Sequence, residues 1–182
     1  MKTTPFSIKI HTMEIQDTLT LAKSSLEREG VKFALIGGFA LAAHGVVRAT
    51  QDIDLLVEGG KKELAKDLLT RAGFKLVFEN PEVLHFSGKG QLDVLFANRE
   101  ATLDMLKRAK SINNFPVPVV SAEDLIGLKI QAYKNNPDRE FQDKADIQSL
   151  LKQVSNLDFN LVKKYADMFN EWGFISDLRK RI

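Results

Sequence analysis

Two aspartates separated by one residue, Asp52 and Asp54, open an apolar stretch that has the character of a β-strand. Because side chains of a strand alternate between its faces, both carboxylates point the same way, with Cα atoms roughly 6.5 to 7 Å apart. Two carboxylates at this spacing suit a hard cation that prefers oxygen ligands, magnesium above all. The pair therefore predicts a metal site on one face of a sheet.

A glycine pair, Gly37 and Gly38, follows the apolar run Phe33 to Ile36 and precedes the two aspartates by a short apolar stretch. Glycine has no Cβ, so the backbone at this turn can approach a ligand closely. The helix expected behind the turn offers backbone N–H groups to a phosphate. A metal site beside an anion site is typical of phosphoryl or nucleotidyl transfer.

A third carboxylate, Asp93, belongs to a later strand-like segment. Taken separately these motifs are common, because glycine pairs make tight turns and Asp-x-Asp pairs can cap a turn or face solvent. Their order, with a short apolar helix between the glycines and the aspartates, favours a functional site. Gly-Gly, then Arg-x-Thr-x-Asp-x-Asp over residues 48–54, then Asp93, resembles the signature of the polymerase-beta-like nucleotidyltransferase superfamily.

This resemblance implies a magnesium-dependent nucleotidyltransferase, an enzyme that moves a nucleoside monophosphate from an NTP to a hydroxyl acceptor. It implies that Asp52, Asp54 and Asp93 are catalytic and bind the metal, with two Mg²⁺ ions in the site. Three crowded carboxylates repel one another, so the metal-free site should be electrostatically strained. Arg48 could hold a phosphate or buttress the glycine turn. The residues expected to bind nucleotide are Gly37, Gly38, Arg48, Thr50 and, later in the chain, Lys129.

The second half of the chain adds a narrower resemblance, to the AbiEii/AbiGii-type toxin nucleotidyltransferases of abortive infection. In those proteins the catalytic domain is followed by a helix carrying a lysine and then by an Arg…Lys-Asp-x-x-Asp helix. The matching positions are Lys129, Arg139, Asp143 and Asp146, with Gln142 where lysine is usual. With the first motifs, the resemblance covers roughly residues 30 to 151. It implies an RNA 3′ end or a protein as acceptor, the toxin role in a toxin–antitoxin system, and an antitoxin protein as partner.

Lys129 and Asp146 each allow two interpretations. As a compact positive charge, Lys129 could bind a nucleotide phosphate, or its stem could follow the edge of a packed helix and carry the ammonium to solvent. Asp146 stands next to Ile147, so it lies near the packed face of its helix. It is expected to support the site by pairing with Lys129 or Arg139 rather than by touching substrate.

Two other functions stay open. One is transfer to a small hydroxyl acceptor, as in the aminoglycoside-type nucleotidyltransferases. The other is a non-catalytic nucleotide-binding protein of the same fold, although the presence of all three aspartates speaks against lost catalysis.

Composition narrows the class of protein. The chain has 182 residues, 44% of them hydrophobic and 27% charged, and a net charge of +2, which is typical of a globular protein rather than a nucleic-acid coating protein. The absence of cysteine excludes disulfides, zinc-thiolate sites and thiol catalysis. Its histidines, His11, His44 and His85, are too far apart for a helical metal-binding pair. Because no apolar run approaches the ~18 residues that span a bilayer, we expect no membrane partner and a cytoplasmic location.

The sequence also predicts the elements that carry these residues. Apolar residues recur at helical spacing from Met13 to Glu29. Strands are expected over residues 33–36, 53–57, 75–78 and 83–87, and around Asp93. A further strand at Val117 to Val120 should lie at an edge, because Pro118 cannot donate to a ladder. The first ten residues suggest a loose arm or an edge strand.

Ser121 and Asp124 form a capping box that starts a helix, and the chain stays helical from there. We therefore expect an α+β fold, with a small mixed β-sheet nucleotidyltransferase core, helices packed on one side and a C-terminal helical extension. Residues 1–120 would form the catalytic core with its N-terminal helix. Residues 121–182 would form a helical region packed on that core, in one compact unit.

Overall fold

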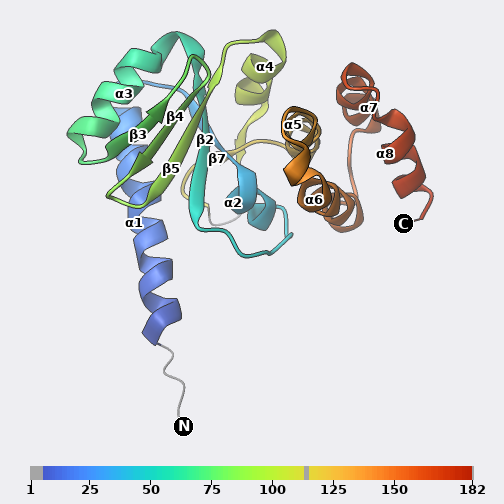
Figure 1. Ribbon diagram of the computed structural model, residues 1–182, viewed down its shortest axis with the longest axis horizontal. Coiled ribbons are helices and arrows are strands. Elements are labelled where there is room, and N and C mark those ends of the chain that lie inside the picture. The colour runs from blue at the N-terminus through green and yellow to red at the C-terminus, as the bar shows by residue number, and fades with distance from the viewer. Residues whose placement is uncertain (1–5, 113–114, 182) are drawn as a thin grey trace.

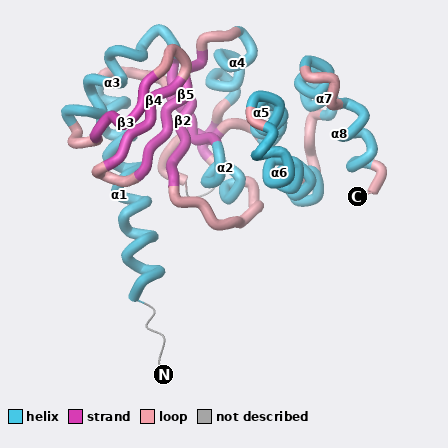
Figure 2. The backbone as a smooth tube through the Cα atoms, in the orientation of Figure 1, coloured by secondary structure: helices cyan, strands magenta, loops and turns pink. Residues whose placement is uncertain are grey.

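Seven β-strands form one mixed sheet in the computed structural model, which describes residues 6–112 and 115–181. The strands are β1 (Phe33–Ile36), β2 (Asp52–Glu58), β3 (Lys75–Glu79), β4 (Val83–Ser87), β5 (Gln91–Ala97), β6 (Lys110–Ser111) and β7 (Pro118–Val119). Their order across the sheet is β3-β4-β5-β2-β1-β7-β6, and Figure 2 shows the longer strands side by side. The strands expected around residues 33–36, 53–57, 75–78 and 83–87 and around Asp93 are confirmed.

The helices lie on both faces of this sheet (Figure 1). They are α1 (Phe6–Arg28), α2 (Gly37–Ala43), α3 (Lys62–Arg71), α4 (Glu100–Arg108), α5 (Ala122–Asn135), α6 (Glu140–Gln153), α7 (Phe159–Met168) and α8 (Trp172–Arg179), with short 3-10 helices at Gly59–Lys61 and Pro137–Arg139. Helices α1 and α3 pack together on one face, whereas α2 packs against β1, β2 and α5 on the other. The α+β fold class is confirmed, with a helical C-terminal extension from α5 to α8, but helices cover both faces of the sheet instead of the one side expected.

The alternation of side chains along β2 explains why the sheet has one apolar and one polar face near its middle. Ile53, Leu55 and Val57 are almost completely buried, whereas Asp52 and Asp54 on the opposite side are partly exposed. Strand residues alternate in this way because successive Cβ atoms point to opposite faces. The apolar face packs on α1, and the opposite, polar face carries the side chains of Asp52 and Asp54.

Helix α5 begins where the capping pattern predicts. The Ser121 hydroxyl accepts a hydrogen bond from the backbone N–H of Asp124, at 3.2 Å, which satisfies one of the first helical amides. Further along α5, Gly127 faces the ring of Tyr165 in α7, and a Cβ there would lie 2.7 Å from that ring. The glycine therefore permits the close approach of α7 to α5.

Two expectations about the chain are wrong. Strand β7 lies between β1 and β6 rather than at the edge. A strand of two residues needs few donors, and the amide of Val120 supplies one to the carbonyl of Leu35, so Pro118 is tolerated. Of the first ten residues, 6–10 belong to α1 instead of an arm or a strand, and residues 1–5 lie outside the described residues. Within the described ranges, no helix combines the length and apolar character that crossing a bilayer requires.

Candidate active site

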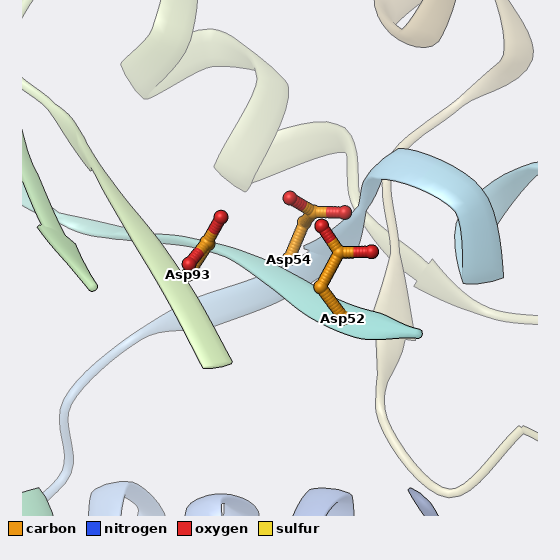
Figure 3. A group of neighbouring side chains, drawn as sticks. All are labelled: Asp52, Asp54 and Asp93. Carbon is orange, nitrogen blue, oxygen red and sulfur yellow. The ribbon is translucent and has the colours of Figure 1, made fainter. Parts of the chain in front are cut away.

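The three aspartates singled out in the sequence come together on one face of the sheet. Strands β2 and β5 pair in parallel with Asp54 directly opposite Asp93, and Asp52 lies two residues before Asp54 on the same face. Each carboxylate contributes one oxygen to a group in which all three oxygens lie within 4.8 Å of one another. Figure 3 shows the three side chains rising from the same side of the two strands. We call Asp52, Asp54 and Asp93 the aspartate cluster.

Burial, together with crowding in this cluster, raises the pKa of Asp54. Burial is the main reason that the pKa of Asp54 rises from 3.8 to about 7, and repulsion from Asp52 and Asp93 adds to it. Arg139 and Lys129 act in the opposite direction but do not cancel the effect. The carboxylates of the cluster therefore repel one another in a partly buried place, and such repulsion favours a bound cation.

The glycine pair packs directly against residues of the cluster. Gly37 has a φ of +65°, and a Cβ at this position would collide with the carboxylate of Asp54. At Gly38 a Cβ would lie 2.7 Å from the Thr50 hydroxyl oxygen. Both glycines are thus required by local packing as well as by any approach to phosphate.

Thr50 and Arg48 lead into β2 and are each held by a carboxylate. The Thr50 hydroxyl donates to Oδ1 of Asp52 at 2.8 Å, which fixes the orientation of that aspartate. The Arg48 Nε lies 3.1 Å from both carboxylate oxygens of Asp146 in α6. Arg48 therefore joins the loop before β2 to the C-terminal helices.

Lys129 is buried in an ion-pair network. Its ammonium lies 2.7 Å from Oδ1 of Asp143 and 2.6 Å from Oδ2 of Asp146, and its side chain is 6% exposed. The expected pairing of Asp146 with Lys129 is therefore present, and the ammonium does not extend to solvent. Arg139 donates through Nε to the second oxygen of Asp143 at 3.1 Å. Buried charges require such partners, because an unpaired charge in the interior is strongly destabilising.

The ion-pair network, which consists of Arg48, Lys129, Arg139, Asp143 and Asp146, borders the aspartate cluster. Its three cations exceed its two carboxylates, so it carries a net positive charge beside three negative side chains. Arg139 keeps a side chain that is 56% exposed while it contacts Asp143. It therefore has guanidinium N–H groups available to a ligand in addition to the bond from Nε.

A cavity of about 500 Å³ connects these groups. The sheet and α2 form its floor, and residues of α5, including Leu128 and Gln131, form its roof. Of the residues that the sequence assigns to the site, those that line the cavity are Gly37, Gly38, Arg48, Thr50, Asp52, Asp54, Asp93 and Lys129. Asp146 does not line it and lies behind Lys129.

Two further cavities lie elsewhere on the described surface, and only one of them shares residues with the candidate site. One of about 540 Å³ shares Arg48, Thr50, Asp52 and Asp93 with it, so the aspartate cluster lies where two openings meet. The other, of about 670 Å³, lies between α1 and the turn from β4 to β5 and contains none of the candidate residues. Although it is larger, it lacks the convergence of charged groups that chemistry requires.

Two residues of the site were not assigned from the sequence. Arg139 lines the cavity, although the sequence connects it only with the AbiEii-type pattern. His85 lies opposite Asp93 in the β4–β5 pair, with Nδ1 2.6 Å from Oδ1 of the aspartate. The sequence contains the information needed to pair these two residues. His85 and Asp93 are equally distant from Lys89 at the middle of the Gly-Lys-Gly turn, so a hairpin centred on that turn places them opposite each other.

Comparisons with known proteins agree with this architecture. No protein-family model matches the sequence, and no curated protein matches it. Among solved structures, it is similar to ANT(2″)-Ia in complex with adenylyl-2″-tobramycin, with a TM-score of 0.63, 17% identity, and coverage of 89% of this chain and 97% of that one.

Two more solved structures have the same fold. An antigenic nucleotidyltransferase-like protein from Paracoccidioides brasiliensis has a TM-score of 0.56 and 19% identity, covering 92% of this chain and 91% of that one. The lincosamide antibiotic adenylyltransferase LnuA, bound to lincomycin, has a TM-score of 0.52 and 17% identity, covering 75% and 96%. The chain therefore has the nucleotidyltransferase fold.

Proposed function

We propose that this protein is a magnesium-dependent nucleotidyltransferase, which moves a nucleoside monophosphate from an NTP to a hydroxyl group of an acceptor. The observation that carries the proposal is that one carboxylate oxygen from each of Asp52, Asp54 and Asp93 lies within 4.8 Å of the others, in a cavity that Gly37 and Gly38 also line. Residues 1–120 would form the catalytic core. Residues 121–182 would form the helical region packed on it, with α5 as the roof of the cavity.

The aspartate cluster fits magnesium by the chemistry of its donors. Its three carboxylate oxygens are hard ligands, which Mg²⁺ prefers over nitrogen or sulfur. The pKa of Asp54 is raised first by burial and then by repulsion from Asp52 and Asp93, and a divalent cation would relieve that repulsion. When bound, two Mg²⁺ ions held by Asp52, Asp54 and Asp93 would stabilise the charge on the attacking and leaving oxygens.

The protein's own residues would accept the proton of the acceptor hydroxyl and bind the triphosphate. In the reaction, the acceptor hydroxyl oxygen bonds to the α-phosphorus, the bond from that phosphorus to the α,β-bridging oxygen breaks, and pyrophosphate leaves. Asp93, or a hydroxide held there, would help to take up the hydroxyl proton. Gly37, Gly38 and Thr50 contact the triphosphate from the floor of the cavity.

The cations of the ion-pair network would attract the triphosphate. Lys129 and Arg48 already share their charges with Asp143 and Asp146, so they contribute mainly to the positive potential of the cavity. Arg139 is the more direct phosphate ligand, because it lines the cavity and its side chain is 56% exposed. A guanidinium can bind phosphate oxygens through two N–H groups at once.

The acceptor that we propose first is an RNA 3′ end or a protein hydroxyl, with the protein acting as the toxin of a toxin–antitoxin pair and an antitoxin protein as its partner. What supports this is the AbiEii-type pattern of the second half. The four positions of that pattern form one ion-pair network beside the cavity, as expected if they serve the same site. They are Lys129, Arg139, Asp143 and Asp146.

A small hydroxyl acceptor is the second candidate. It is favoured by the similarity to ANT(2″)-Ia, which was solved in complex with adenylyl-2″-tobramycin and whose match covers 89% of this chain and 97% of that one. A nucleotide-binding protein without catalysis is the third candidate.

The deciding experiment supplies each α-³²P-labelled NTP with MgCl₂ to the protein together with total RNA, a cell protein extract, tobramycin or lincomycin. Label in RNA or protein supports the first candidate, and label in an antibiotic supports the second. The matched control is Asp52→Asn, which should give no labelled product. NTP binding with magnesium but without any labelled product supports the binding protein.

A further inference from the structure

A histidine beside the aspartate cluster has no part in the reaction described above. His85 lies opposite Asp93 in the antiparallel pair of β4 and β5, and its Nδ1 lies 2.6 Å from Oδ1 of Asp93. A carboxylate can only accept hydrogen bonds, so Nδ1 carries the hydrogen and donates it. One oxygen of Asp93 is therefore engaged by the imidazole, and the other is left for a ligand.

The imidazole is itself held in place from its other side. The paired positions Asp54, Asp93, His85 and Phe78 form one row across β2, β5, β4 and β3. The ring of Phe78 packs on that of His85, with centroids 5.4 Å apart and an angle of 38° between the rings. Because β4 lies between two paired strands, the backbone under His85 is fixed as well. The imidazole therefore lies between the ring of Phe78 and the carboxylate of Asp93.

Each member of the aspartate cluster has a support of its own. Asp52 accepts from the Thr50 hydroxyl, and Asp54 packs against Gly37. Asp93 has the corresponding support from His85. Side chains that orient metal-binding groups typically change metal affinity or activity by about 10- to 100-fold when they are removed.

We propose that His85 is a positioning residue, which holds Asp93 through Nδ1 so that the second carboxylate oxygen faces the metal. The inference rests on the proposed function, because it takes Asp93 as a metal ligand. His85 acts through Asp93 and does not itself bind the metal.

The test measures Mn²⁺ binding by electron paramagnetic resonance, with α,β-methylene-ATP present so that no turnover is needed. His85→Leu keeps a side chain of similar bulk and removes the donor, whereas His85→Asn keeps a donor near the place of Nδ1. Ser87→Ala, on the same face of β4 two residues further, is the control for changes in the strand. Melting temperatures show whether each variant is folded.

We expect His85→Leu to weaken Mn²⁺ binding by about 10- to 100-fold, and His85→Asn to recover most of that loss. Ser87→Ala should match the wild type. Wild-type affinity in folded His85→Leu, or a His85→Asn variant as weak as His85→Leu, would overturn the proposal.

The two proposals fail in distinguishable ways. Wild-type protein that binds Mn²⁺ and loses it in His85→Leu, but transfers no nucleotide, refutes the transferase function and leaves the role of His85 intact. Intact transfer with unchanged Mn²⁺ binding in His85→Leu refutes only the role of His85. A wild type that binds no Mn²⁺ refutes both.

Discussion

Replacing Asp54 by asparagine should stabilise the metal-free protein at pH 8. The folded protein raises the pKa of Asp54 from 3.8 to about 7, so the folded state binds this proton more tightly than the unfolded state. The resulting stabilisation is complete below pH 3.8 and is lost as the pH rises through about 7. At pH 8 the folded wild type must therefore hold a partly buried carboxylate that Asp52 and Asp93 repel, whereas the Asp54→Asn variant carries no charge there.

The size of the effect follows from that pKa. A carboxylate fully sealed from water with this change in pKa would cost about 4 kcal/mol at pH 8. Asp54 lines a cavity that opens to solvent, so water screens part of the repulsion. We expect a gain of about 1 to 3 kcal/mol in the free energy of unfolding for Asp54→Asn, or about 3 to 10 °C in melting temperature for a chain of this size.

The assay is thermal unfolding from pH 5 to pH 8 in EDTA, and again with MgCl₂. The wild type should lose stability with rising pH relative to Asp54→Asn, and MgCl₂ at pH 8 should stabilise the wild type more than the variant. Asp67→Asn, which removes an exposed carboxylate paired with Arg71 in α3, is the control and should change little. A variant no more stable than the wild type at pH 8 without metal, or one with the same pH dependence, would refute the reasoning.

The other predictions concern the ion-pair network and the glycine turn. Lys129→Met should lower the free energy of unfolding by about 3 to 5 kcal/mol in urea titrations, because Asp143 and Asp146 stay buried without their shared cation; a loss below about 1 kcal/mol would contradict a structural role. Gly37→Ala should be more destabilising than Gly30→Ala, since both positions have positive φ but only a Cβ at Gly37 meets the carboxylate of Asp54; equal melting temperatures would argue against that contact. Arg139→Gln should weaken magnesium–NTP binding in calorimetry by about 1.5 to 3 kcal/mol, whereas Arg71→Gln, at the exposed pair with Asp67 in α3, should not. Unchanged affinity in Arg139→Gln would remove Arg139 from the phosphate site.

The sequence predicts those parts of the molecule that depend on neighbours along the chain. The alternation of a strand is a local property, so Asp52 and Asp54 could be placed on one face without knowledge of the sheet. The cap at Ser121 depends on Asp124 three residues later, so the sequence predicts it for the same reason. The helix α1 begins at Phe6, earlier than expected, because a formed helix extends with one more hydrogen bond for each added residue.

The sequence could not predict contacts that join distant segments. Arg48 and Asp146 are 98 residues apart, and neither position specifies the other by spacing. The environment of Lys129 depends on the docking of α6 against α5, so a charge that could face a ligand or solvent is instead enclosed by two carboxylates. For His85, the hairpin turn does contain the information, but pairing it with Asp93 requires the register of β4 on β5.

The link from Arg48 to Asp146 has a consequence for anyone who cuts or recombines this chain. The segment from Phe33 to Phe96 contains the glycine turn and all three aspartates, so, judged by its motifs alone, it carries the whole candidate metal site. Its loop before β2, however, is tied down by a carboxylate on α6, beyond the last strand of the sheet. A graft that carries the motifs onto another protein would need the partner carboxylate of α6 as well, in the same position, to reproduce the shape of the cavity.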